Sequence, residues 1–186
     1  MSYTEAERQQ LLQIARESIR CGLEKGKPCA VKLKDLPAAL REKRASFVTL
    51  QKAGKLRGCI GTISAYQPLA EDVAQRAYAA AFGDSRFLPV RADELMHLDI
   101  SISVLSPPEP LAFTSEADLL AQIQPQVDGL IIEEDGLHGV FLPSVWESLP
   151  NKREFLRQLK RKAGLPADYW SDAIKVSRFR TEYLSC

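Results

Sequence analysis

Residues 56–62, Leu-Arg-Gly-Cys-Ile-Gly-Thr, constrain the fold of this chain most, because an alternating pattern, two glycines and a cysteine coincide there. Side chains at alternate positions of an extended strand share one face of the sheet. We therefore predict a strand with one core face and one opposite face. The core face comprises Leu56, Gly58 and Ile60, and the opposite face comprises Arg57, Cys59 and Gly61.

The face opposite the core carries the residues that are most able to take part in a chemical reaction. Arg57 and Cys59 lie two strand positions apart, roughly 6 to 7 Å, close enough for a guanidinium to favour a thiolate. Gly61 beside them is predicted to leave a gap the size of a side chain. The alternative is that Gly58 and Gly61 mark a bulge or close packing, and that Cys59 is a small buried apolar residue.

This strand is predicted to form the second half of a β-hairpin. Residues 46–51 alternate well enough for a strand, and residues 52–55 form a short glycine-containing connection. Thr49 lies on the first strand, where its hydroxyl would come near Cys59. Threonine is also simply a good strand former, and the residues alone favour that interpretation.

The remaining chain intersperses helices with hairpins, which favours an α+β fold over a doubly wound sheet. Residues 98–104 alternate strictly and predict a half-buried strand. Asp135-Gly136 is a strong turn signal for a second hairpin over residues 129–142. Capping residues and apolar periodicity predict the helices, and the last stretch predicts one final edge strand. The predicted helices span residues 5–24, 68–82, 115–123 and 152–162, and the edge strand spans residues 173–183.

An acid and a base, Asp84 and Arg86, follow the helix predicted over residues 68–82. Their spacing fits either a member of a site or an ion pair that closes a loop. Surface ion pairs are common and individually weak, so the residues alone favour an ion pair that closes the loop over a member of a site.

Several motifs together resemble one known family. They are Leu56-Arg57-Gly58-Cys59-Ile60-Gly61, Ser46-Phe47-Val48-Thr49-Leu50, Asp84-Ser85-Arg86-Phe87, Ser101-Ile102-Ser103-Val104-Leu105-Ser106, Phe141-Leu142-Pro143, Phe155-Leu156 and Lys162-Ala163-Gly164-Leu165. This set resembles the AMMECR family, which includes the AmmeMemoRadiSam system protein A proteins. Ser144 departs from the pattern, because the family often has glutamine there.

The resemblance implies a compact α+β fold of two unequal lobes, with hairpin-rich antiparallel or mixed sheets covered by helices. It implies one domain over residues 1–186, with both lobes sharing one core. It also strengthens the site interpretation of Asp84 and Arg86. A Memo-like protein and a radical-SAM enzyme are the partners that it implies.

Composition excludes a strong electrostatic preference for any partner. The chain has 25 basic and 24 acidic residues, a net charge of +1, so we expect neither nucleic acid nor a membrane as partner. The basic residues within 152–162 are interpreted as a solvated helix face rather than a nucleic-acid site. The sequence has no signal peptide or apolar run of membrane-spanning length, so we expect a soluble cytoplasmic protein.

The cysteines and histidines predict neither a disulfide framework nor a metal site. Cys21, Cys29, Cys59 and Cys186 lack paired zinc-ligand spacing and are expected to be free thiols. His97 and His138 stand alone, and no role is assigned to either. The spacing of Gly58 and Gly61 is too short for a phosphate-binding loop, so we expect no nucleotide or other cofactor.

Two functional hypotheses follow. In the first, the chain is an enzyme or a component of an enzyme system, with Cys59 and Arg57 in a cleft between the lobes for thiol-based catalysis or group carriage on an unknown small-molecule or protein substrate. Asp84 is a weaker catalytic candidate. Gly58, Gly61, Thr49 and Arg86 are candidate binding residues. In the second hypothesis, the same strand is a rigid surface that docks the Memo-like protein or the radical-SAM enzyme.

Overall fold

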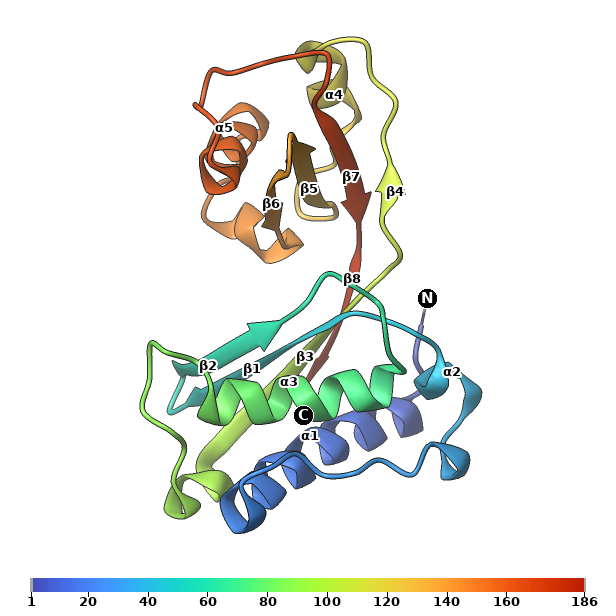
Figure 1. Cartoon of the computed structure of the whole chain (residues 1–186), viewed down its shortest axis with the longest axis vertical. Helices are drawn as coiled ribbons and strands as arrows, with labels where there is room; N and C mark the ends of the chain where they lie inside the picture. Colours follow the sequence, from blue (N-terminus) through green and yellow to red (C-terminus); the bar gives the residue numbers. More distant parts are fainter. Residues whose placement is uncertain (1, 186) are drawn as a thin grey trace. The chain divides into compact units, whose positions relative to one another are not determined.

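The computed structural model describes residues 2–185 and confirms an α+β fold. The chain divides into two compact units of unequal length (Figure 1). Unit 1 comprises the described residues up to Ser106 together with those from Glu182 onward, and unit 2 is Pro107–Thr181. Each unit has its own four-stranded sheet and its own cluster of buried apolar side chains. The prediction that both lobes share one core stays a prediction.

Unit 1 is an antiparallel sheet with two long helices on one face (Figure 1). The strand order is β2-β1-β3-β8, so β2 lies at one edge. The strands are β1 (Ser46–Lys52), β2 (Lys55–Gly61), β3 (Leu98–Leu105) and β8 (Thr181–Ser185). The helices are α1 (Glu5–Lys25) and α3 (Leu69–Phe82), and the short elements are η1 (Leu33–Asp35), α2 (Ala38–Arg41) and η2 (Ala92–His97).

The helix ends of unit 1 follow directly from the sequence. Thr4 and Glu7 form a reciprocal capping box at the start of α1, and Gly26 ends the helix in the left-handed conformation. Pro68 precedes α3, whose alanines allow close packing, and Gly83 follows its last turn. These predictions are confirmed. Among residues 2–185, no helix combines the length and the apolar character needed to cross a membrane.

Unit 2 has the strand order β4-β7-β5-β6. The strands are β4 (Glu109–Pro110), β5 (Gly129–Glu134), β6 (Leu137–Phe141) and β7 (Lys175–Phe179). The helices are α4 (Glu116–Gln122) and α5 (Lys152–Ala163), with η3 (Pro143–Glu147) between β6 and α5. In its core the rings of Trp146 and Phe155 stack with centroids 3.7 Å apart. The predicted hairpin and both predicted helices are confirmed.

The single edge strand predicted over residues 173–183 is wrong. The stretch forms two strands, β7 and β8, which belong to different sheets. Val176 of β7 belongs to the buried cluster of unit 2, whereas Leu184 of β8 belongs to that of unit 1. The apolar residues of this stretch therefore belong to two different cores. In addition, β7 is not an edge strand, because it lies between β4 and β5.

The prediction of free thiols at Cys21 and Cys29 is also wrong, because these two residues form a disulfide. Their Cα atoms are 5.5 Å apart, a normal separation for a disulfide. Gly26 ends α1 with a positive φ of 68°, which turns the chain so that Cys29 comes back beside the last turns of the helix. Cys59 is a free cysteine, and Cys186 lies outside the described residues.

Candidate functional site

A β-bulge in the β1–β2 hairpin determines which way the side chains of β2 point. Thr49 is opposite Cys59 and Leu50 is opposite Gly58, but the next residue of β1, Gln51, is opposite Leu56. Arg57 is therefore the extra residue, and the alternation reverses across it. Leu56 is 41% exposed, so the prediction that it lies in the core is wrong.

The two glycines of β2 are explained by packing contacts. A Cβ atom at Gly58 would overlap the carbonyl oxygen of Ala80, so this glycine lets α3 lie directly on the strand. A Cβ atom at Gly61 would overlap the ring of Phe47, its cross-strand partner. The gap predicted beside Cys59 is therefore filled by an aromatic ring.

Cys59 lies half-buried opposite Thr49, with 3.2 Å between its Sγ and the threonine Oγ1. Its backbone N–H does not pair with β1 but donates to the Oδ2 of Asp84 at 2.9 Å. Cross-strand residues that do not exchange backbone hydrogen bonds have the closer side chains. The strand register thus brings this hydroxyl and this thiol together.

Asp84 connects the backbone of Cys59 to the side chain of Arg86. The Arg86 Nε donates to Oδ1 at 3.0 Å and its Nη2 donates to Oδ2 at 2.7 Å. The hydrogen bonds from Arg86 have the largest effect on the Asp84 carboxyl, and the bond from the N–H of Cys59 has the second largest. Together they hold the pKa of this carboxyl well below its usual range. The hydrogen bond to Asp84 raises the pKa of Arg86, and the charge of Cys59 adds a smaller effect in the same direction. The pair therefore closes the loop and also contacts Cys59.

Arg57 is engaged by a different carboxylate. Its Nε and Nη2 donate to the two oxygens of Glu94 at 3.0 and 2.9 Å, and its Nη1 donates to the carbonyl of Leu88 at 2.8 Å. Lys52 Nζ also donates to Glu94, at 3.0 Å. All three guanidinium nitrogens of Arg57 thus hold the segment that follows Asp84. Arg86 is the guanidinium linked to Cys59.

Glu94 is the part of this site that the sequence reasoning missed. It is 8% exposed, and the hydrogen bonds from Arg57, followed by the N–H of Arg91, hold the pKa of its carboxyl well below the usual range. The spacing of Arg91 and Glu94 at the start of η2 fits a capping contact, which was an available local signal. The contact to Arg57 spans 37 residues and has no local signal.

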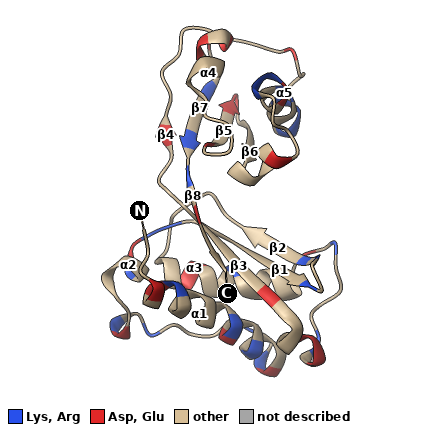
Figure 2. Cartoon of the chain, turned by 180° about the vertical axis from the view of Figure 1, so that it is seen from behind, with Lys and Arg blue, Asp and Glu red and all other residues tan. Residues whose placement is uncertain are grey.

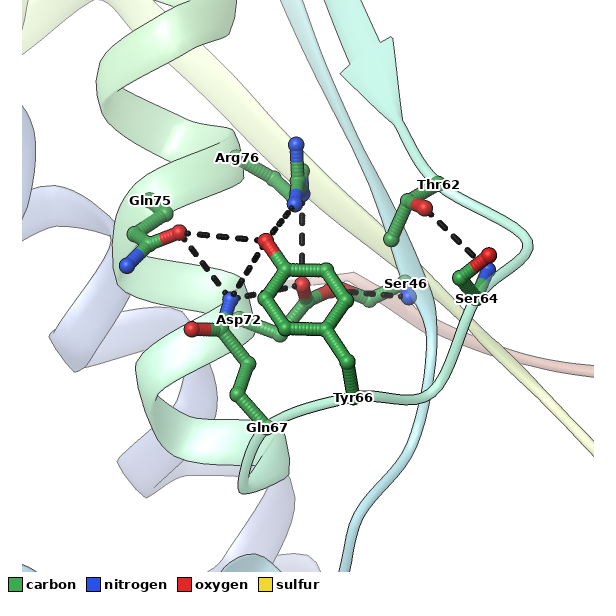
Figure 3. A network of polar contacts seen from close by, with 8 residues as sticks. All are labelled: Ser46, Thr62, Ser64, Tyr66, Gln67, Asp72, Gln75 and Arg76. Carbon is green, nitrogen blue, oxygen red and sulfur yellow. Dashed lines mark hydrogen bonds and ion pairs between the residues drawn. The ribbon is translucent and has the colours of Figure 1, made fainter.

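The far end of β2 is held by a network around Asp72, which is fully buried in α3 (Figure 3). Its carboxylate accepts from the N–H and the hydroxyl of Ser46 at 3.0 and 2.6 Å. Gln67 Nε2 and Arg76 Nε also donate to it, and Arg76 Nη2 donates to the Tyr66 hydroxyl at 2.6 Å. The loop after β2 is thereby tied to α3 and to the start of β1.

The other residues considered from sequence lie apart from Cys59. His97 and His138 are both exposed. Lys160 is fully buried, with its Nζ 2.8 Å from Glu116 Oε1 and 5.5 Å from the ring centre of Trp170. The interpretation of the α5 basic residues as a solvated face is therefore wrong for Lys160. Within residues 2–185, no group of three His, Cys, Asp or Glu side chains is placed to hold a metal ion.

The fold and the site define an α+β protein of two units, with a half-buried thiol on a bulged edge strand and an aspartate–arginine pair attached to it. The AMMECR1 family matches residues 12–184. The chain therefore belongs to the AMMECR1 family, and the predicted membership is confirmed.

Relatives cover most of the chain. A protein from Methanothermobacter thermautotrophicus is 41% identical over 178 residues, which cover 92% of this chain and 90% of the relative. A protein from Thermococcus gammatolerans is 39% identical and covers 92% of this chain and 86% of its own length. The crystal structure of the uncharacterized protein PH0010 from Pyrococcus horikoshii is similar, with a TM-score of 0.87, 35% identity and coverage of 97% and 91% of the two chains.

Proposed function

We propose that this AMMECR1-family protein is an enzyme, or a component of an enzyme system, in which the Cys59 thiolate forms a covalent bond with an electrophilic carbon of its substrate. The sulfur donates an electron pair to the carbon, and the leaving group departs with the electron pair of the bond that breaks. The thiol proton goes to solvent. The product is a thioether or thioester on Cys59, which serves covalent catalysis or group carriage. We place this chemistry in the cytoplasm, whose reducing conditions keep a free thiol such as Cys59 reduced. The Cys21–Cys29 disulfide is then one of the exceptions to the usual absence of disulfides in that compartment.

The observation that carries this proposal is the surroundings of the Cys59 thiol. A hydroxyl lies 3.2 Å from its sulfur, and an exposed guanidinium, Arg86, is attached to its backbone through Asp84. A hydroxyl can donate a hydrogen bond to a thiolate, and the Arg86 charge favours the thiolate by offsetting the Asp84 carboxylate that contacts Cys59. Cys59 is only partly buried, so we expect a small reagent to reach its sulfur.

Alkylation tests the proposal in a parent protein carrying Cys186→Ser, so that Cys59 is the free thiol to be labelled. The rate with iodoacetamide is measured by mass spectrometry from pH 5 to 9, beside a model cysteine peptide. We expect Cys59 to react faster than the peptide below pH 7, and Thr49→Val to reduce that advantage. Cys59→Ser is the control for other modification. A rate equal to or below that of the peptide throughout would contradict the proposal.

A second candidate function is docking of a Memo-like protein or a radical-SAM enzyme. It is favoured by two apolar side chains, Leu88 and Met96, which are 84% and 81% exposed. Both lie near the contacts of Arg57, which binds Leu88 O and Glu94. Strand addition to β2 is disfavoured at Cys59, because Asp84 already accepts its outward N–H.

A pull-down with each candidate partner separates the two functions. Docking predicts that Leu88→Ser with Met96→Ser abolishes capture, whereas Cys59→Ser leaves capture unchanged. Loss of substrate labelling in Cys59→Ser with capture intact would show two separate roles for this region. Capture that survives the double serine change would exclude these side chains as the docking surface.

A further inference from the structure

The disulfide between Cys21 and Cys29 lies beside a cavity of unit 1. The cavity has a volume of about 390 Å³, and its walls come from α1 and from the segment between α1 and α2. Cavities of roughly 300 to 1,000 Å³ are typical of small-molecule sites. Cys29 lines this cavity and Cys21 does not. Cys29 is therefore the half of the disulfide that lies next to space for a small molecule.

The two cysteines also differ in burial. Cys21 is 8% exposed and belongs to α1, whereas Cys29 is only partly buried and lies in a stretch without regular secondary structure, residues 28–32. Thiol–disulfide exchange begins when a thiolate attacks an accessible sulfur of the disulfide. The Sγ of Cys29 lies 3.2 Å from the carbonyl oxygen of Glu17, which can accept a hydrogen bond from this thiol once the disulfide is broken. Burial thus makes Cys29 the sulfur to be attacked and Cys21 the sulfur to leave.

The charge around Cys29 is positive. Residues 25–35 contain four lysines and a single acid, Asp35, and the described ion pairs of unit 1 use other bases. The lysines are Lys25, Lys27, Lys32 and Lys34. Figure 2 shows blue positions along the segment that joins α1 to α2. Of the two acids at the cavity, Glu17 is already paired with Arg20. Positive charge attracts an anionic thiol and stabilises the thiolate that leaves.

We propose that the Cys21–Cys29 disulfide is a redox-active site that reacts with a small anionic thiol bound in this cavity. The thiolate attacks the Sγ of Cys29, and Cys21 leaves with the electron pair of the broken bond and takes a proton from solvent. Cys29 then carries the small thiol as a mixed disulfide. A second small thiolate attacks the sulfur of the bound thiol, which releases the two small thiols as a disulfide and leaves Cys29 reduced. This chemistry does not use Cys59, so it goes beyond the proposed function.

The disulfide ties an irregular segment to α1. Residues 28–32 have no regular secondary structure, and next to them the side chains of Val31, Leu33 and Leu36 pack against the core of unit 1. Irregular surface segments are the parts of a fold that open most readily. Reduction therefore loosens one wall of the cavity, while α1 and the apolar contacts stay in place.

The test uses the full chain with Cys59→Ser and Cys186→Ser, in which Cys21 and Cys29 are the remaining cysteines. The reagents are N-acetylcysteine, which has a carboxylate, and N-acetylcysteine amide, which lacks it, at equal thiolate concentrations. Acid quenching and peptide mass spectrometry locate the mixed disulfide. We expect the adduct on Cys29. We also expect N-acetylcysteine to react about threefold faster than its amide, the size of effect expected from one exposed charge contact.

Two lysine variants test the charge argument. Lys32→Gln should remove the preference for N-acetylcysteine, because Lys32 lines the cavity. Lys55→Gln removes an exposed lysine of the β1–β2 hairpin and should leave the preference unchanged. An adduct on Cys21, no reaction, or equal rates for the two reagents would overturn the proposal. Reduction by a thioredoxin-type protein alone, with no adduct from either small thiol, would assign the disulfide to a protein partner and overturn it as well.

A second measurement separates a redox-active disulfide from a structural one. Circular dichroism and amide hydrogen exchange compare the disulfide-bonded chain with a chain carrying Cys21→Ser and Cys29→Ser. We expect an unchanged helical signal and faster exchange confined to residues 26–36. Unfolding of the double-serine chain would show that the disulfide is needed for the fold and would overturn the proposal.

Discussion

The β1–β2 and β5–β6 hairpins have the same kind of turn and differ in the strand that follows it. Both turns place two residues at positive φ, with Ala53 and Gly54 at 51° and 72° and Asp135 and Gly136 at 49° and 80°. The pairing of β5 with β6 then continues without interruption, whereas that of β1 with β2 shifts at Arg57. The turn thus determines that a hairpin forms, and the bulge determines where its side chains point.

The bulge has a direct consequence for the candidate site. It frees the side chain of Arg57 to bind Glu94 and the Leu88 carbonyl, and it leaves Cys59 opposite Thr49. Bulges are frequent next to functional sites because they redirect side chains. The regular hairpin of unit 2 has no such redirection, and its polar residues collect at the turn.

The largest expected effect compares two aliphatic residues, one from each hairpin. Ile132 of β5 is fully buried, so Ile132→Ala should lower the free energy of unfolding by roughly 2 to 5 kcal/mol. Leu56 of β2 is on the exposed side of the bulge, so Leu56→Ala should cost less than about 1 kcal/mol. Urea unfolding followed by circular dichroism measures both. Equal losses would mean that Leu56 lies in the core and that the bulge is absent.

The next effect concerns the glycine in each hairpin that faces a helix. Gly58→Ala should lower the free energy of unfolding by about 3 kcal/mol, because its Cβ would overlap the backbone of α3. Gly139→Ala should cost about 1 to 2 kcal/mol, because its Cβ would lie 2.9 Å from the Leu159 carbonyl oxygen in α5.

Two probes measure these glycine variants. Both tryptophans, Trp146 and Trp170, belong to unit 2, so their fluorescence follows Gly139→Ala, and circular dichroism follows both variants. A larger loss for Gly139→Ala than for Gly58→Ala would contradict the closer approach of α3 to β2.

A smaller effect depends on pH and tests the Arg57–Glu94 ion pair, which the bulge of the β1–β2 hairpin makes possible. Glu94 has a lowered pKa in the folded state and about 4.3 when unfolded. Its contribution to stability is therefore present above about pH 4.3 and is lost as the pH falls toward the folded value. Glu94→Gln should lower the free energy of unfolding at pH 7. Between pH 7 and pH 3.5, that free energy should fall less in Glu94→Gln than in the wild type. Urea midpoints at the two pH values test this, and parallel losses in both proteins would contradict it.

The parts of the fold that were predicted correctly have local signals. The capping box of Thr4 and Glu7, the alternation of β3 and the Asp135-Gly136 turn each depend on residues close in sequence. The α+β class followed from helices interspersed with hairpins, and the family motifs agreed with it. The position of Thr49 near Cys59 followed from the predicted hairpin.

The parts that were missed depend on contacts between distant residues. Alternation assumes regular pairing, so it could not show that the register with β1 would shift at Arg57. The filling of the space at Gly61 by Phe47, and the contact of Arg57 with Glu94, are likewise decided by tertiary packing. The predicted cleft stays a prediction.

The central claim is that Arg86, rather than Arg57, supports the chemistry of Cys59. The direct measurement is the rate of Cys59 alkylation by iodoacetamide at pH 7 in the Cys186→Ser parent, with Arg86→Gln and Arg57→Gln compared after both are shown to be folded. We predict that Arg86→Gln slows the reaction by about threefold to tenfold, because it removes the positive charge that is linked through Asp84 to the backbone of Cys59. Arg57→Gln should change the rate less than about twofold, because Cys59 interacts electrostatically with the guanidinium of Arg86 but not with that of Arg57. An equal or larger slowing in Arg57→Gln would contradict this account.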